Sequence, residues 1–373
     1  MCREVTKHVL AVLVAVAEYQ SSCGKKKGSE KMTPNLFDYA TKELSQDAFL
    51  CWLLAWADEE CRDADSTLHA LGLSLLNRVL GLHGKAQREC VTVRVHRQLL
   101  RADIVAEVGS DTVLLIEDKV HAGLHGDQLE RYRREMEKEF GGRELLPVFV
   151  KTGDQSSYEE AERSGYRLLL REHILDLLRP WRDRTSNAIF ADFLANLESR
   201  EALVESYATT PVAQWTKQWD PWIGFYKRLQ RELRDREFVW NYVPNASGGF
   251  VGAWWHFVKW TDPNGRARNV YLQIEQGPLC FKIEVDDVDV NDAQRAGLRD
   301  DWCGRILEKA KEAGVAAMRP AKMGSGTWMT VAKVELGDWM AVRPDGLLDL
   351  AATLTKLGEA AMIVDRAAST PRP

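Results

Sequence analysis

The strongest constraint on the fold of this chain is a hairpin pattern between residues 101 and 120. Two stretches, 101–108 and 112–120, each have the length and apolar content of one strand, and Gly109-Ser110-Asp111 lies between them. Three-residue loops that contain glycine are a common connection between antiparallel strands. We therefore expect Val108 to pair with Thr112, which fixes the partner of every other residue in the hairpin.

This register places Asp103 opposite Glu117. Successive residues of a strand point to opposite faces, so Lys119 shares the face of Glu117 while the side chain of Asp118 points the other way. Facing residues have Cβ atoms about 4.5 to 5.5 Å apart, and like charges at that distance destabilise a sheet. The two carboxylates therefore need a compensating cation.

A divalent metal ion is the compensation that these residues predict. Mg²⁺ favours one or two carboxylates together with waters and phosphate oxygens, and the backbone carbonyl of Asp118 is expected to join Asp103 and Glu117 as a ligand. A bound metal lowers the pKa of its water and polarises a phosphoryl oxygen. Lys119 would orient the attacking water and offset charge on phosphorus. The pattern thus predicts phosphodiester hydrolysis with Mg²⁺ or Mn²⁺ as cofactor.

The segments around the hairpin predict the fold class. Apolar residues recur at helical spacing and then alternate with polar ones at strand spacing before the hairpin; after it, a helix, a strand, a short strand and a helix follow. This order favours an α/β (α+β) domain with a central mixed sheet flanked by helices on both faces. The expected elements are helices at 36–56, 68–82, 127–140 and 172–178 and strands at 91–95, 101–108, 112–120, 145–151 and 166–170.

The motif itself resembles a known family. Asp103, thirteen residues, then Glu117-Asp118-Lys119 is similar to the signature of the PD-(D/E)XK nuclease superfamily, although Ala102 replaces the proline that precedes the first aspartate there. The resemblance covers about residues 33 to 180. It implies a restriction-endonuclease-like core and a metal-dependent nuclease.

Three further residues extend this resemblance. Glu43 resembles the acidic residue that many members carry on the helix before the sheet, which implies a catalytic or metal-binding role. Gln128 and Tyr132 resemble the Gln-x-x-x-Tyr motif of the exonuclease-type branch. Residues four apart on a helix share a face, so this pair is expected to support the site or to contact the substrate.

A run of basic residues leads into Asp103. The net charge of the chain is -5, so binding to phosphates needs a local patch rather than an overall basic surface. A solvated surface is the alternative interpretation of such a run. As the substrate we expect nucleic acid, with DNA favoured over RNA. The candidate nucleic-acid-binding residues are Lys85, Arg88, Arg94, Arg97 and Arg101.

Cysteine use and the N-terminus bear on the compartment. The seven cysteines are scattered and form no CxxC pair, which indicates a reducing compartment and no structural zinc. Residues 1–32 are expected to be an N-terminal extension, which forms either a surface helix or a segment upstream of a natural start at Met32. Their apolar run, 8–17, is shorter than the ~20 residues that span a bilayer. We expect a cytoplasmic protein with no membrane contact.

The composition changes after Pro180, since eleven of the thirteen tryptophans lie from Trp181 onward. We expect a nuclease domain at 33–204 and a C-terminal α+β accessory domain at 205–373. Most of the tryptophans are expected in a core, although stacking on exposed bases is the alternative. The expected elements of the second domain are helices at 215–236, 291–313 and 345–363 and strands at 250–260, 269–287 and 328–335.

Two alternatives to the nuclease hypothesis stay open. The first is a catalytically inactive nucleic-acid-binding or sensor protein on the same fold. In the second, the C-terminal domain carries the main function through substrate binding, sensing, a partner protein or a homodimer. That domain resembles accessory domains of prokaryotic antiviral defence proteins. No Gly-x-Ser-x-Gly elbow and no phosphate-binding loop of the Gly-x-x-x-x-Gly-Lys type is present.

Overall fold

The computed structural model describes residues 34–121, 123–124, 126–233, 237–244, 249–262, 264–286 and 289–369. The expected extension at 1–32, with its start at Met32, lies outside these residues. Contacts divide the described chain into two units, with the boundary between Ala202 and Leu203. Among the described residues, no helix has the length and apolar content needed to cross a membrane.

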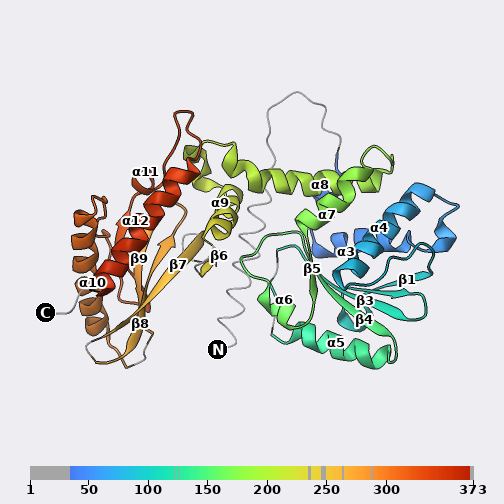
Figure 1. Ribbon diagram of the computed structural model, residues 1–373, viewed down its shortest axis with the longest axis horizontal. Helices are drawn as coiled ribbons and strands as arrows, with labels where there is room; N and C mark the ends of the chain where they lie inside the picture. The colour runs from blue at the N-terminus through green and yellow to red at the C-terminus, as the bar shows by residue number, and fades with distance from the viewer. Residues whose placement is uncertain are drawn as a thin grey trace. The chain divides into compact units, whose positions relative to one another are not determined.

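The first unit is built on a five-stranded mixed sheet (Figure 1). The first two strand pairs are antiparallel, and the two pairs after them are parallel. The mixed sheet and the α/β class expected from the sequence are both confirmed. In spatial order the strands are β1 (Val93–Arg97), β2 (Ile104–Val108), β3 (Thr112–Lys119), β4 (Glu144–Lys151) and β5 (Arg167–Leu170).

The hairpin between β2 and β3 has the register that the three-residue loop predicts. Val108 pairs with Thr112, and the ladder continues to Ile104 and Ile116. The strand expected from residue 101 begins only at Ile104, because residues 99–101 form a 3-10 turn. Asp103 therefore lies one residue beyond the ladder, beside the β3 segment that carries Glu117.

Helices cover both faces of this sheet. One apolar cluster joins inward-facing residues of β2 to β5 with α3, α4, α7 and α8, and a second joins the opposite face with α5 and α6. The helices are α2 (Leu36–Tyr39), α3 (Glu43–Ala55), α4 (Ser66–Leu82), α5 (Gln128–Glu139), α6 (Glu159–Arg163), α7 (Arg171–Leu178) and α8 (Ala188–Glu205), with 3-10 turns η1 (Glu59–Cys61), η2 (Leu99–Arg101) and η3 (Arg179–Trp181).

The prediction of a single helix at 36–56 is wrong, because this segment forms two helices, α2 and α3. The short α2 begins after Asn35, whose side chain caps Phe37 and whose amide donates to the backbone of Asp192 at 2.7 Å. The chain then leaves the helical conformation at Ala40, and α3 starts afresh at Glu43. A tertiary contact with α8, itself not expected from the sequence, thus anchors the start of the first helix.

The second unit contains an all-antiparallel five-stranded sheet, in the order β10-β9-β8-β7-β6. The strand expected at 269–287 is two strands, since the chain turns back at Gln276, which adopts a φ of 53°. The elements are β6 (Phe238–Val243), β7 (Phe250–Thr261), β8 (Ala267–Ile274), β9 (Leu279–Glu284), β10 (Trp328–Val334), α9 (Asp220–Glu232), α10 (Asp292–Glu312), α11 (Leu336–Trp339), α12 (Leu350–Ser369), η4 (Ser206–Ala208) and η5 (Val212–Lys217).

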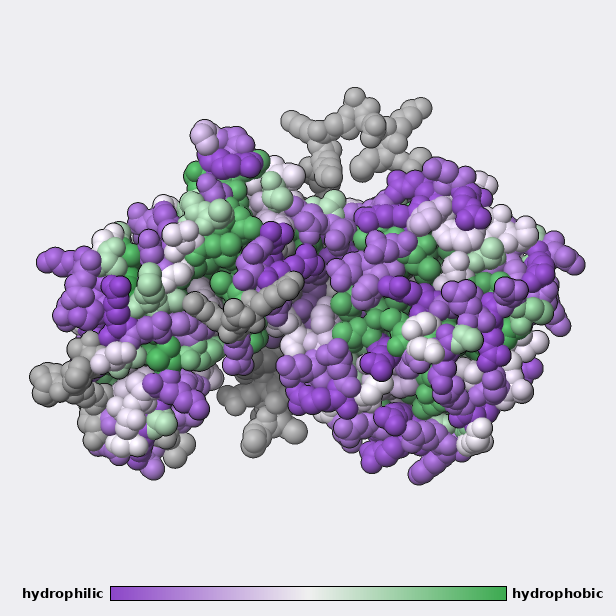
Figure 2. Space-filling view, viewed as in Figure 1, coloured by the Kyte–Doolittle hydropathy of each residue, from purple (hydrophilic) through white to green (hydrophobic). Residues whose placement is uncertain are grey.

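Tryptophans fill the core of this second unit, as expected. Trp215, Trp222, Trp255 and Trp302 are buried among residues from the sheet and from α9, α10 and α12. Burial on this scale removes these four rings from any stacking on exposed bases. Trp219 and Trp254 are half-buried, and Trp328 at the start of β10 has 65% of its surface exposed. Hydrophilic side chains cover much of the face seen in Figure 2, with apolar residues visible between them.

The helices α3 and α4 meet backbone to backbone at Gly72. A Cβ atom added there would lie 2.6 Å from the Ala57 nitrogen and 2.7 Å from the Leu53 carbonyl oxygen. No side chain fits at such distances without moving one helix. The glycine therefore sets how closely α4 approaches the helix that carries Glu43.

We predict that Gly72→Ala lowers the free energy of unfolding by about 1 to 3 kcal/mol, the usual cost of overpacking. The matched control is Gly81→Ala in the same helix, where the added Cβ meets nothing within 4 Å. Alanine there is expected to stabilise by about 0.5 to 1 kcal/mol through its helix propensity. Urea denaturation of both variants checks the prediction, and shifts of the same sign would contradict it.

Candidate active site

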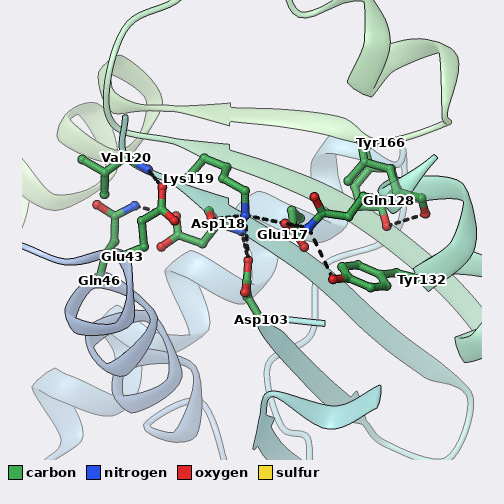
Figure 3. A network of polar contacts seen from close by, with 11 residues as sticks. Glu43, Gln46, Asp103, Glu117, Asp118, Lys119, Val120, Gln128, Tyr132 and Tyr166 are labelled. Atoms are coloured by element: carbon green, nitrogen blue, oxygen red, sulfur yellow. Dashed lines mark hydrogen bonds and ion pairs between the residues drawn. The ribbon is translucent and has the colours of Figure 1, made fainter. Parts of the chain in front are cut away.

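The ammonium of Lys119 lies at the centre of the acidic residues (Figure 3). It forms an ion pair with Glu117 and lies 3.4 Å from Oδ2 of Asp103. It also donates to the backbone carbonyl of Asp118 at 3.1 Å. The two carboxylates and the carbonyl expected from the sequence to hold a metal thus converge on one point, and a positive charge already occupies that point.

Burial changes the pKa values of Glu117 and Lys119. Burial and the negative charge of Asp103 raise the pKa of Glu117 to about 7, although Lys119 opposes the rise. Burial alone would lower the pKa of Lys119, but Glu117 and then Asp103 outweigh it and hold that pKa above its usual value. Lys119 is therefore protonated at neutral pH, and its charge keeps two acids tolerable inside the fold.

Asp103 is held in place by backbone groups. Its Oδ2 accepts a hydrogen bond of 2.9 Å from the backbone N–H of Asp118. Its carbonyl accepts one of 2.9 Å from the N–H of Gln98, which closes the turn between β1 and β2. The carboxylate reaches β3 although Asp103 lies outside the strand ladder.

The helix α5 supplies the next layer. Its first residue, Gln128, donates to Oε1 of Glu117 at 2.5 Å and contacts the hydroxyl of Tyr132 at 3.4 Å. Spacing by four residues puts both on the helix face that packs on the sheet. Both side chains lie beside Glu117, where the motif implies that they support the site.

Glu43 stands apart from the carboxylate pair. At the first position of α3, it accepts a 2.9 Å hydrogen bond from the backbone N–H of Val120. Its charge still contributes to the raised pKa of Lys119. The structure therefore brings Glu43 to the edge of the site without a hydrogen bond to Asp103, Glu117 or Lys119.

Sequence reasoning missed a polar cluster behind the strand. The amide of Gln46 donates to Oδ1 of Asp118 at 2.5 Å and accepts from the hydroxyl of Thr152 at 2.6 Å. Burial, followed by the charge of neighbouring Asp47, raises the pKa of Asp118 well above its usual value. The available signal was Ser45-Gln46-Asp47, a polar run on the inward side of an otherwise apolar helix.

The basic run divides into two sets. Lys85 forms an ion pair with Glu144, and Arg88 forms one of 2.8 Å with Asp111, so both are engaged by other parts of the unit. Within the described ranges, no ion pair engages the other three, whose side chains are exposed. These are Arg94, Arg97 and Arg101.

The donor set fits a hard cation. The described residues contain no cluster of three or more His, Cys, Asp or Glu side chains with metal-binding geometry. A hard cation, however, also takes backbone carbonyls, and the Asp118 carbonyl supplies one beside Asp103 and Glu117. Oε2 of Glu117 is buried with no hydrogen-bond partner in the described structure. Such an orphaned oxygen needs a partner, and a cation would provide it.

A family model described as the PD-(D/E)XK nuclease superfamily matches residues 34–209. The match includes every residue discussed in this site. No curated protein and no solved structure matches the chain at a significant level.

We predict that Gln46→Leu lowers the free energy of unfolding by about 1 to 3 kcal/mol, because Asp118 loses a hydrogen bond in a buried position. Thr152→Val removes only the hydrogen bond from the Thr152 hydroxyl to Gln46, so it should lower the free energy of unfolding by less. Gln87→Leu, at an exposed glutamine of the same unit, is the control and should stay within about 0.5 kcal/mol of wild type. Equal urea midpoints for Gln46→Leu and Gln87→Leu would refute the prediction.

Proposed function

Because residues 34–209 belong to the PD-(D/E)XK nuclease superfamily, we propose that the protein is a divalent-metal-dependent nuclease that hydrolyses phosphodiester bonds, with DNA favoured over RNA. The observation that carries the proposal is the convergence of Asp103, Glu117 and the Asp118 carbonyl on the ammonium of Lys119. Three oxygens of this kind form the ligand set that Mg²⁺ or Mn²⁺ takes together with substrate phosphate.

Each side chain has a separate task in this proposal. Asp103, Glu117 and the Asp118 carbonyl would hold the ion, which supplies a water of lowered pKa and polarises the phosphoryl oxygen. Lys119, protonated because of its two acidic neighbours, offsets the charge that develops on phosphorus. Gln128 holds Oε1 of Glu117, so the second oxygen of that carboxylate points to a fixed place.

A second candidate function rests on the same contact. Lys119 already supplies one positive charge to the two carboxylates, so the folded site holds a cation of its own without a metal. This favours the catalytically inactive nucleic-acid-binding or sensor protein as the alternative. We further propose a cytoplasmic location, a role in prokaryotic antiviral defence, and a homodimer or partner protein bound through the C-terminal domain.

We predict cleavage of DNA with Mg²⁺ or Mn²⁺ and none with EDTA. Lys119→Ala and Asp103→Asn should each reduce the rate by about 100-fold or more, the usual effect of losing one group that stabilises the transition state. The control is Lys138→Ala, an exposed lysine on α5, which should cleave as wild type does. The assay uses plasmid, linear and single-stranded DNA, with RNA alongside.

Two outcomes would count against the nuclease. A wild-type protein that binds nucleic acid but never cuts it with any divalent ion would support the inactive alternative. Undiminished cleavage by the Lys119→Ala protein would remove this lysine from the chemistry.

We also predict that Lys119→Met binds Mg²⁺ more tightly than wild type does. The ammonium occupies the point where the three oxygens meet, so removing it ends the competition between two cations. A ligand that binds only the folded state raises stability in proportion to its affinity. The rise in melting temperature with added Mg²⁺ should therefore be larger for Lys119→Met than for wild type or Lys138→Met; equal shifts would contradict the competition.

A further inference from the structure

The turn before Asp103 has a strained backbone. Three of its residues that are not glycine have positive φ: 56° at Gln98, 46° at Leu100 and 70° at Arg101. The left-handed region is unfavourable for residues with a Cβ, and for a bulky side chain such as that of leucine it is an outlier. Strain of this kind persists only where the surroundings impose it, and it is concentrated at functional sites.

Two contacts impose this conformation. The Gln98 N–H bonds to the carbonyl of Asp103, and the Ala102 N–H bonds to the carbonyl of Leu99. Leu99 also packs against the apolar cluster that includes Leu129 and Met136 of α5. With Leu99 anchored inward, the left-handed turn points the next side chain outward, and Leu100 is 40% exposed.

Exposure alone does not distinguish Leu100. Leu36 and Leu44 are 53% and 45% exposed in the same unit, and single exposed leucines are ordinary. Those two lie in helices with unstrained backbone. Only Leu100 is held outward by a costly conformation, at most about 11 Å of backbone from Asp103.

Two arginines flank this leucine. Arg97 and Arg101 are exposed, and in the described part of the chain neither forms an ion pair. In contrast, Lys85 and Arg88 of the same basic run are paired with acidic residues. An apolar side chain between two unpaired arginines is complementary to a DNA duplex. The arginines can contact the phosphates on its outside, and the leucine can contact the stacked bases within.

We propose that the turn Leu99–Arg101 is a wedge, in which Leu100 inserts between stacked base pairs of double-stranded DNA while Arg97 and Arg101 bind the flanking phosphates. Leucine is among the side chains that proteins insert between base steps, at the expense of local unstacking. The strained backbone keeps the side chain extended before DNA arrives. The proposal rests on the proposed nuclease function, because it places the opened step beside the phosphate to be cut.

Fluorescence of 2-aminopurine tests the insertion without any cleavage. Duplexes carrying the probe at successive positions are bound to the full-length protein in EDTA, and an unstacked probe becomes brighter. Wild type should brighten one step by severalfold. Leu100→Ala should lose most of this signal while its affinity changes by less than about threefold, since the arginines remain.

The controls separate the wedge from general damage. Leu36→Ala removes a leucine that is more exposed than Leu100 and should keep the full signal. Leu100→Gly relieves the positive φ, so it should be at least as heat-stable as wild type and still fail to brighten the probe. A full signal with Leu100→Ala, no brightening by wild type at any step, or binding to single strands alone would each overturn the proposal.

A cleavage assay separates this proposal from the nuclease itself. With Mg²⁺, Leu100→Ala should cut a fully paired duplex about tenfold more slowly than wild type and a duplex with a mismatch at the brightened step at a similar rate. Equal defects on both substrates, or no defect, would overturn the wedge and leave the nuclease standing. Brightening by a protein that never cuts would retain the wedge and overturn the nuclease.

Discussion

The ion pair between Lys119 and Glu117, with Asp103 beside it, is the interaction on which the first unit depends. Glu117 is buried and Asp103 is half-buried, so their carboxylates repel each other and lose hydration. Removing one member of a buried charged group leaves an uncompensated charge that costs about 3 to 5 kcal/mol. The lysine makes the acids compatible with a folded core. The same contact makes them available as a cation-binding pair, so stability and chemistry share one interaction.

Successive side chains of β3 point to opposite faces of the sheet, so they contact two different helices. Glu117 and Lys119 face α5 and its Gln128, whereas Asp118 faces α3 and its Gln46. One short segment of strand is therefore hydrogen-bonded to helices on both sides of the sheet. Neither helix can shift without moving a residue next to the proposed metal ligands.

The hairpin and its site were predictable because their rules are local. A three-residue loop and a period of two fix which residues of β2 and β3 face each other, and a spacing of four places Gln128 beside Tyr132. The separate helix α2, the turn at residues 99–101 and the role of Gln46 were not predictable. Each involves a contact far along the chain: Asn35 with Asp192, Leu99 with α5, and Gln46 with Asp118.

The position of the acids on one hairpin has a consequence for folding. Asp103, Glu117 and Lys119 are joined by a local turn, whereas β4 can pair with β3 only after the α5 crossover has formed. Contacts between residues near in sequence form before distant ones. We therefore expect the lysine to meet its acids while water still surrounds them, before the later strands and α5 exclude solvent from the ion pair.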